Sequence, residues 1–412
     1  ARSYGRGMRL LHTSDWHLGR SFHREGMLGH QAAYVDHLLE VVERERVDVV
    51  LVAGDVYDRA LPPVDAVALA DEALARLAAS RARVVVTSGN HDSARRLGFS
   101  ARLIDAAGVH LRTDPDGVGT PVLLEDDHGP VAIHGLPYLD PESVREPWGL
   151  PVRSHEATLT EAMRRVRADL DARPGVRSVV MAHAFVGGGV RPDEARDAAR
   201  EMSSDSERDI SVGGVSLVPL PVFDGVDYVA LGHLHGRHVL SERVHYSGSP
   251  LAYSFSEADH RKGSWLVDLA ADGSVRTEFV DAPVPRRLAR LRGSLEELLT
   301  DARHAEHEDS WLQVTLTDTD RPAQAMERLR RRFPHTLVLG FDAPLPSVGG
   351  LPATRTSGRS DHDVVAEFFS TLRGRPPAND ESALLREAVD ACCEDDDLAR
   401  EQRAVNREGV AG

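Results

Sequence analysis

Five short apolar runs between residues 10 and 231 each end in Asp, Asn or His side chains, and this arrangement restricts the chain to few folds. The runs span residues 10–11, 47–52, 84–86, 179–181 and 228–231. They are short, apolar and rich in β-branched residues, as expected of strands that are buried on both faces. We therefore expect five buried strands whose carboxyl ends carry the chemistry of the protein.

Helical spacing separates the first three runs. Apolar side chains recur every three or four residues at Leu28, Ala32, Val35, Leu39 and Val42, and again at Val67, Leu74, Leu77 and Ala78. Alternating strands and helices predict an α/β domain whose sheets are covered by helices. Further apolar runs at residues 131–133, 244–246 and 265–267 add strands. The predicted fold class is therefore α/β, a two-sheet α/β sandwich with a small α+β capping domain and a helical C-terminal tail.

The segments of the chain differ in character. Residues 8–282 hold the α/β domain, in which residues 186–214 are rich in Gly, Asp, Glu and Ser and predict a long surface excursion. Residues 283–342 predict the capping domain, because Ser294 and Glu297 fit a helix capping box and an alternating strand pattern follows. A linker rich in Pro, Gly and Ser spans residues 343–360, and residues 361–412 form a tail with two amphipathic segments.

Composition argues against several classes of protein. No run of about 18 apolar residues occurs, so no membrane span is expected, and the N-terminus lacks a signal-peptide pattern. We interpret Met8 as the native start and the preceding residues as an upstream extension. The only cysteines, Cys392 and Cys393, are adjacent and fit neither a zinc spacing nor an unstrained disulfide, which favours a reducing cytoplasm. Lys262 is the single lysine, and the net charge of −16 opposes phosphate binding unless bound cations offset it locally.

The side chains that follow the five runs are types that bind divalent metals. They are Asp15 and His17, Asp55, Asn90 with His91 and Asp92, His183, and His233 with His235. Because sites in open α/β sheets form at the carboxyl ends of strands, we expect these side chains to converge. Oxygen and imidazole ligands suit two cations such as manganese, iron or zinc, which a bridging carboxylate holds about 3.5–4 Å apart. Such a pair activates water and stabilises the attacking and leaving oxygens at phosphorus.

The order of the motifs, DxH, GD, GNHD, H and GHxH, resembles that of the calcineurin-like metallophosphoesterases. Within that superfamily, the strings LHTSDWHLGRSF, VAGDVYDRALPP and GNHDS are similar to the SbcD family, the bacterial nuclease subunits that partner the ATPase SbcC. The resemblance is close from residue 8 to about residue 260 and looser in the capping domain and tail.

The resemblance implies two sets of metal ligands that share Asp55. One metal would be held by Asp15, His17, Asp55 and His235, and the other by Asp55, Asn90, His183 and His233. His91 would be the general acid that protonates the leaving alcohol, and Asp92 would orient its imidazole. Archaeal and eukaryotic relatives carry a second His three residues after the bridging Asp. This chain has Asp58 there, so the role of that His does not transfer.

The resemblance also implies a biological role. It implies a nuclease with two divalent metal ions, expected to be Mn²⁺, that acts as a 3′→5′ exonuclease on double-stranded DNA ends and as an endonuclease on single strands and hairpins. Such a protein works as a homodimer with SbcC in DNA repair, recombination and replication, in the cytoplasm and associated with the nucleoid. SbcC would dock on residues 361–412, whose apolar stripes follow a flexible linker, and its ATP cycle would control the access of DNA.

Residues beside the motifs allow more than one interpretation. Trp16 could stack on a base, but packing beside the site is favoured. The arginines close to the metal motifs could contact DNA phosphates or could be solvated surface charges. These arginines are Arg20, Arg59, Arg95 and Arg96. We interpret His23, His30 and His37 as surface or internally satisfied residues.

Two other functions fit part of the pattern. The same metal ligands serve small-molecule phosphodiesterases and protein phosphatases, so the ligands alone do not choose the substrate. The capping domain, the linker and the amphipathic tail favour an enzyme that acts on DNA. A DNA-end scaffold whose nuclease activity is dispensable is disfavoured, because every expected ligand is present together with His91 and Asp92.

Overall fold

The computed structural model describes residues 7–187, 217–342 and 360–391. Residues 188–214 of the predicted excursion, residues 343–359 of the predicted linker, and both cysteines with the acidic end lie outside the described residues. The chain divides into two compact units. The first contains the chain up to residue 290 with residues 305–313 and 333–338, and the second contains residues 291–304, 314–332 and those from 339 onward. The two units interleave along the chain, and the predicted boundary at residue 282 stays a prediction.

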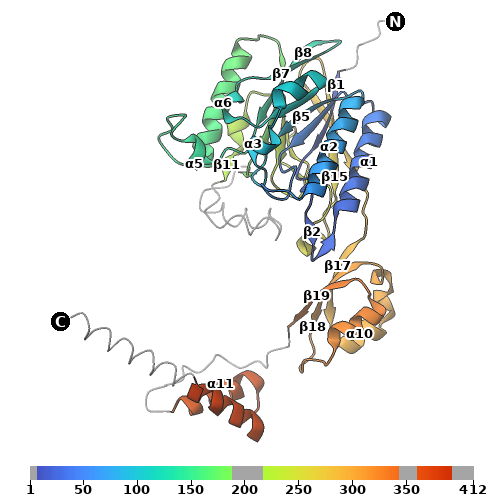
Figure 1. Ribbon diagram of the computed structural model, residues 1–412, viewed down its shortest axis with the longest axis vertical. Helices are drawn as coiled ribbons and strands as arrows, with labels where there is room; N and C mark the ends of the chain where they lie inside the picture. Colours follow the sequence, from blue (N-terminus) through green and yellow to red (C-terminus); the bar gives the residue numbers. More distant parts are fainter. Residues whose placement is uncertain (1–6, 188–216, 343–359, 392–412) are drawn as a thin grey trace, which may run out of the picture. The chain divides into compact units, whose positions relative to one another are not determined.

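Six strands form the first sheet of the first unit (Figure 1). They lie in the order β16 (Val275–Asp281), β15 (Gly263–Leu269), β1 (Met8–Thr13), β4 (Val49–Ala53), β5 (Arg83–Thr87) and β6 (Val109–Arg112). The strands β1, β4, β5 and β6 run parallel, while β15 pairs antiparallel with both β1 and β16. Because β1, β4 and β5 are parallel, the loops that follow them leave the sheet at the same edge.

The second sheet also has six strands. Their order is β13 (His238–Val239), β14 (Val244–Tyr246), β12 (Tyr228–Gly232), β9 (Arg177–His183), β8 (Gly129–Leu136) and β7 (Val122–Asp126). The four central strands run parallel, and β13 and β7 pair antiparallel at the two sides. All eight predicted strands of the α/β domain are present in the two sheets.

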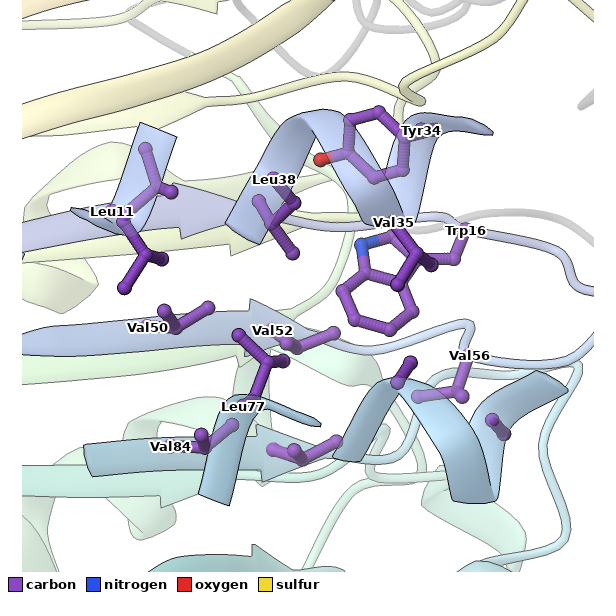
Figure 2. Packing of buried hydrophobic residues seen from close by; sticks show 14 of the residues in the cluster. Leu11, Trp16, Tyr34, Val35, Leu38, Val50, Val52, Val56, Leu77 and Val84 are labelled. Atoms are coloured by element: carbon purple, nitrogen blue, oxygen red, sulfur yellow. The ribbon is translucent and has the colours of Figure 1, made fainter. Parts of the chain in front are cut away.

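Apolar layers join the two sheets to each other and to the helices. Successive side chains of a strand point to opposite faces, so Leu10 and Leu51 pack between the sheets whereas Leu11 and Val50 face the helices. The helices α1 (Leu28–Arg44) and α2 (Val64–Ala79) cover the first sheet in this way (Figure 2). The helix α6 (His155–Asp171) covers the second sheet. The predicted two-sheet α/β sandwich is therefore confirmed.

Trp16 belongs to the layer between the first sheet and its helices. Its indole is 1% exposed and lies beside Tyr34 and Val35 (Figure 2). The indole Nε1 donates a hydrogen bond to Thr13 Oγ1 at 3.0 Å, and Thr13 Oγ1 is also hydrogen-bonded to Tyr34 OH at 2.8 Å. The packing interpretation of Trp16 is therefore confirmed, and this side chain is not placed to stack on a base.

Short elements connect the sheets and helices of this unit. They are β2 (Ser21–Phe22), β3 (Glu25–Gly26), α3 (Ala94–Leu97), α4 (Ala101–Ile104), η1 (Asp105–Ala107), η2 (Pro115–Gly117), α5 (Pro141–Val144), β10 (Val186–Gly187), β11 (Val218–Pro219), η3 (Leu220–Phe223) and η4 (Phe255–Glu257). The described helices include none with both the length and the apolar composition that crossing a bilayer requires.

The chain beyond residue 287 alternates strands and helices. The elements are β17 (Leu288–Gly293), α9 (Leu295–Thr300), η5 (Ala302–His307), β18 (Trp311–Leu316), α10 (Ala325–Arg332) and β19 (Thr336–Phe341), with the sheet order β17-β18-β19. Ser294 caps α9 by accepting a hydrogen bond from the Glu297 amide at 3.3 Å. The tail contains α11 (Asp361–Arg373) and a further helical stretch at residues 379–391. The α+β character of the predicted capping domain and the helical tail are thus confirmed.

Two buried histidines, His12 and His245, lie between the sheets and make the stability of the fold depend on pH. His12 Nε2 donates to Leu231 O at 3.1 Å, because a carbonyl can only accept, so His12 Nδ1 accepts from Tyr228 OH at 3.0 Å. His245 stacks on the Tyr228 ring, and its Nδ1 is buried without a hydrogen-bond partner. Burial lowers the pKa of His12 to about 3 and the pKa of His245 to about 4.

A His245→Phe variant is expected to be more stable than wild type at pH 5 by about 2 kcal/mol, and similar to it at pH 7.5. The folded pKa of His245, about 4, lies below the ordinary value of 6.5, so the unfolded chain binds more protons once the pH falls below 6.5. The stability that neutral His245 contributes is therefore lost between about pH 6.5 and about pH 4. Denaturant unfolding of both proteins at the two pH values measures this difference. Equal losses of stability in the two proteins would contradict a protonation penalty at His245.

Candidate metal centre

The loops that follow β1 and β4 are joined by backbone hydrogen bonds. The Asp15 amide donates to Gly54 O at 3.0 Å, and the His17 amide donates to Asp55 O at 3.0 Å. The loop after β12 joins them, because the His233 amide donates to the Asp15 carboxylate at 3.1 Å. The carboxyl ends of strands from both sheets therefore meet at one place, as the sequence pattern predicts.

Four of the predicted metal ligands have a strained backbone. Asp15, His17, Asp55 and His233 have φ angles of 53°, 47°, 52° and 109°, in the left-handed region that residues with a Cβ rarely adopt. Such conformations persist where the surrounding structure enforces them, and they concentrate at functional sites. Here they turn short side chains from the strand ends toward a common centre.

Asp55 lies at this centre. Its Oδ1 accepts a hydrogen bond from the His91 amide at 2.8 Å. Its Oδ2 lies 3.3 Å from His183 Nε2 and 3.7 Å from His17 Nε2, two rings from different sheets. One carboxylate oxygen between two imidazole nitrogens is the arrangement expected of a ligand that is shared by two cations.

The remaining predicted ligands form a group on each side of Asp55. On one side, ligand atoms of Asp15, His17 and His235 lie within 4.8 Å of one another, and the two Nε2 atoms are 2.9 Å apart. On the other side, Asn90 Oδ1 lies 2.9 Å from His183 Nε2 and 3.0 Å from His233 Nδ1. The structure thus brings together all seven predicted ligand side chains.

The charges at this centre suit cations. Burial lowers the pKa of His17 well below its ordinary value and that of His233 to about 3, so both rings are neutral and can donate a lone pair at pH 7. Burial opposes the charge on His183, but Asp55 raises the pKa of that imidazole to about 9. Burial raises the pKa of Asp15, with a contribution from Asp55. The proton on His183 therefore balances part of the negative charge of Asp55. A bound cation would replace this proton and balance the same charge.

The orientation of individual rings also fits metal binding. His183 Nδ1 donates to Ala53 O at 2.9 Å, which directs Nε2 to Asp55 and Asn90. The Nε2 atoms of His17 and His235 face each other at hydrogen-bonding distance, while His17 Nδ1 is buried without a hydrogen-bond partner. Imidazoles that turn nitrogens toward the same point are typical of a metal site.

Glycines allow the close approach of these groups. A Cβ on Gly89 would lie 2.1 Å from Asp55 Oδ1, and a Cβ on Gly54 would lie 2.3 Å from His183 Nδ1. Gly54 also has a φ of 86°. Both glycines therefore leave space that a side chain would take from Asp55 and His183.

The contacts of His91 and Asp92 differ from the expected ones. His91 Nδ1 donates to the backbone oxygen of Asp58 at 2.7 Å, so that carbonyl orients the ring. The Asp92 carboxylate instead accepts from the amides of Gly89, Val56 and Tyr57 at 2.9–3.1 Å. Burial, then Asp55, raises the pKa of Asp92 to about 6. Asp92 thus fastens the GNHD loop to the loop after β4 and acts on His91 only through the backbone.

The four predicted DNA-binding arginines differ in position. Arg20 lies nearest to the site, with its guanidinium 3.6 Å from the Asp58 carboxylate and 5.2 Å from the centre of the Tyr253 ring. Arg59 also lies 3.6 Å from Asp58, but it is largely exposed. Arg95 and Arg96 are exposed in the last turn of α3. Of the four arginines, Arg20 and Arg59 thus contact Asp58, whose backbone oxygen holds the His91 ring.

Several residues that support the site have no strong signal in the sequence. Gln31 Nε2 donates to His17 O at 2.8 Å, and Tyr253 OH donates to Trp16 O at 2.6 Å, so both fix the loop after β1. Glu257 Oε1 lies 3.3 Å from His235 Nδ1, and Lys262 Nζ donates to Glu257 Oε2 at 2.6 Å. The sequence feature that could have indicated one of them is that Lys262 is the single lysine of an arginine-rich chain.

Two family models match different parts of the chain. Residues 8–237 match the model of the calcineurin-like phosphoesterases, a range that contains the elements from β1 to β12 and every predicted ligand. The chain belongs to the calcineurin-like phosphoesterases. This phosphoesterase is therefore a hydrolase of phosphoesters from a family that uses divalent metal ions. Residues 284–371 match a second model, SbcD_C, the type 5 capsule protein repressor C-terminal domain, and the two matches together confirm the predicted SbcD-type resemblance.

Solved structures similar to this phosphoesterase are distant in sequence. A dimetal phosphatase from Danio rerio is 16% identical, with 68% of this chain and 98% of that chain covered and a TM-score of 0.41. GAP50, the anchor in the inner membrane complex of Plasmodium, is 12% identical, with 84% and 99% covered and a TM-score of 0.40. A protein of Thermus thermophilus is 13% identical, with 66% and 99% covered and a TM-score of 0.37. These likenesses are too distant to transfer an activity to this chain.

Proposed function

We propose that this phosphoesterase is a two-metal DNA nuclease whose ligands are the seven predicted side chains. The observation that carries the proposal is the position of Asp55, with one carboxylate oxygen between His17 and His183. One ion would be held by Asp15, His17, Asp55 and His235, and the other by Asp55, Asn90, His183 and His233. With two divalent ions bound, expected to be Mn²⁺, such a centre supplies an activated water and neutralises charge on the phosphoryl oxygens.

Other side chains near the proposed ions would bind the substrate and protonate the leaving group. Asn90, His91 and His233 are partly exposed whereas Asp15, His17 and His235 are buried, so the DNA phosphate approaches from the side of the first three. Hydrogen bonding to Asp58 O fixes the His91 ring, which supports His91 as the general acid that protonates the leaving alcohol from Nε2. Arg20, beside Asp58, is positioned to contact a neighbouring phosphate.

DNA is favoured over other phosphodiesters by the second family match. Residues 284–371 resemble the C-terminal region of SbcD-type proteins, and a small-molecule phosphodiesterase or protein phosphatase does not account for that region. The proposed activities are 3′→5′ cleavage of double-stranded ends and endonucleolytic cleavage of single strands and hairpins.

Cleavage of an end-labelled DNA hairpin by the purified chain with Mn²⁺ tests this function, with bis-p-nitrophenyl phosphate as a generic diester. We expect cleavage of both, lost after chelation and lost in Asp55→Ala. If only the generic diester is hydrolysed, the result supports the metal centre. It rejects DNA as the substrate of the isolated chain. If neither is hydrolysed while two ions are bound, the phosphodiesterase assignment itself is wrong.

Exposed apolar side chains follow two loops of the site and support the proposed homodimer. Leu61, Val64 and Val67 are 63%, 82% and 44% exposed, and Phe99 and Leu103 are each 78% exposed. Exposed large apolar side chains that gather into one patch are typical of a surface that binds another protein. We propose that these two segments contact a second copy of the chain.

A Val64→Glu/Phe99→Glu variant is expected to convert the dimer to a monomer, because a buried unpaired carboxylate opposes association. Size-exclusion chromatography with light scattering measures the mass of each protein. Leu123→Glu is the matched control, since Leu123 is 47% exposed on β7 in the second sheet and is not part of the proposed surface. A Val64→Glu/Phe99→Glu protein that remains dimeric would exclude these segments from the dimer contact.

Deletion of residues 361–412 is expected to abolish binding of the ATPase partner and leave Mn²⁺-dependent cleavage intact. The described part of this tail exposes Phe368 by 55% and Leu384 by 66%, which suits docking of amphipathic helices on a partner. Co-purification with SbcC and cleavage of the generic diester are the two measurements. Co-purification of the truncated chain would place the docking surface elsewhere.

A further inference from the structure

A buried ion pair lies directly behind one of the proposed metal ligands. The side chains of Glu257 and Lys262 are 0% and 6% exposed, and Lys262 Nζ lies 2.6 Å from Glu257 Oε2. Removing two charges from water is costly unless the pair is well satisfied by further hydrogen bonds. A buried ion pair by itself therefore adds little to the free energy of unfolding, which points to another role for this pair.

Lys262 is satisfied by three partners around the loop after β12. Its Nζ donates to Glu257 Oε2, to Ser249 Oγ at 2.9 Å and to the backbone oxygen of His235 at 2.9 Å. The Ser249 amide also donates to His235 O, at 3.2 Å. The backbone of His235 is therefore fixed by groups that follow it in the chain by 14 and 27 residues.

Glu257 holds the ring of the same histidine. Its Oε1 lies 3.3 Å from His235 Nδ1, and its Oε2 accepts from Lys262 and from the Tyr253 amide at 3.3 Å. An acceptor at Nδ1 keeps the ring proton on that nitrogen and leaves the lone pair of Nε2 toward His17. The ring and the backbone of His235 are thus held by the two ends of one ion pair.

We propose that Glu257 and Lys262 are a positioning pair for the metal centre, which set the tautomer and the direction of the His235 ring. Glu257 accepts a hydrogen bond from Nδ1 of His235, and Lys262 orients Glu257 while it donates to the His235 carbonyl. The pair acts on the ion held by Asp15, His17, Asp55 and His235, and only indirectly on the other ion. This inference rests on the proposed metal centre.

A pair of double variants separates the hydrogen bond from the charges. E257M/K262M replaces the ion pair with apolar side chains of similar length, a change that buried ion pairs commonly tolerate without loss of folding. E257Q/K262M is also neutral but keeps an acceptor oxygen facing His235 Nδ1. The two variants therefore differ in the group that faces the His235 ring.

The experiment is a titration of metal-free protein with Mn²⁺, in which electron paramagnetic resonance measures free and bound ion. We expect wild type to bind two ions. In E257M/K262M one ion is expected to bind as in wild type and the other to bind about 10–100-fold more weakly. E257Q/K262M is expected to recover most of that loss.

The buried pair of Asp126 and Arg177 supplies a matched control. Their side chains are 12% and 5% exposed and lie 2.5 Å apart, at the opposite end of β9 from His183. D126M/R177M removes an ion pair of similar burial about 20 Å along the strand from the site. We expect this variant to bind both ions as wild type does.

Each outcome bears on a separate claim. Failure of wild type to bind two ions would overturn the metal centre itself, independently of Glu257. If wild type binds two ions and E257M/K262M binds them equally well, the positioning role is wrong. The positioning role is also wrong if the affinity for both ions falls to the same extent in E257M/K262M and in D126M/R177M. It is wrong, too, if E257Q/K262M recovers none of the lost Mn²⁺ affinity.

Discussion

A His91→Ala variant is expected to keep both metal ions and to cleave DNA about 10²–10⁴-fold more slowly than wild type. The ring lies beside the centre, with its centroid 4.8 Å from that of His17, and Asp58 O holds its Nδ1 at 2.7 Å. Its Nε2 therefore faces away from this hydrogen bond, and in the doubly protonated ring it can give its proton to a leaving oxygen, while the seven proposed ligand side chains remain unchanged. Loss of this proton donor raises the barrier without removing the cations.

The measurement combines metal content with the rates on two substrates. The alkoxide that leaves DNA needs a proton more than p-nitrophenolate does, so the loss of rate is expected to be larger for DNA than for bis-p-nitrophenyl phosphate. His23→Ala is the control, because His23 is an exposed histidine whose ring contacts Phe22 and Phe255, neither of which is a proposed ligand. Equal losses on the two substrates would argue against acid catalysis, and loss of bound metal would make His91 a ligand instead.

The sequence predicted the position of the site because the strand ends determine it. Each ligand follows a buried strand of one of two parallel arrays, and parallel strands bring their carboxyl ends to the same edge. Local patterns of apolar and β-branched residues are sufficient to find such strands. The eight strands and the convergence of the side chains at their ends could therefore be predicted without knowledge of the order of strands in the sheets, whereas the choice of seven ligands among these side chains came from the family resemblance.

The sequence did not predict the contacts that depend on how the loops fit together. Asp92 follows His91 directly, which suggested that it orients the ring, but its carboxylate reaches the amides of Val56 and Tyr57 more than 30 residues earlier. Glu257 ends the short helix η4 and Lys262 directly precedes β15, and their role depends on the position of His235. Such contacts are set by the packing of loops, which leaves no periodic pattern in a single sequence.

An Asp55→Ala variant is expected to lose both the tight binding of two ions and all detectable cleavage. Asp55 is 2% exposed, and His183 with His17 holds the pKa of its carboxyl well below the ordinary value although burial raises it. The carboxylate is therefore charged, and because the proposed centre shares it between the two ions, its removal takes one ligand from each of them. It also leaves His183 without its counter-charge, and removal of one partner of a buried ion pair costs about 3–5 kcal/mol of stability.

Thermal unfolding with and without Mn²⁺ distinguishes these two effects. Wild type is expected to gain about 2.7 kcal/mol of stability for each bound ion at an ion concentration of about 100 times Kd, because the ions bind only the folded chain. Asp55→Ala is expected to unfold at lower temperature and to gain almost nothing from Mn²⁺. Asp126→Ala is the control, since it removes one partner of the Asp126–Arg177 ion pair at the opposite end of β9 from His183, so it should lose stability but keep the Mn²⁺ gain. A full Mn²⁺ gain in Asp55→Ala would show that Asp55 does not bridge the two ions, and the division of ligands around it would have to be abandoned.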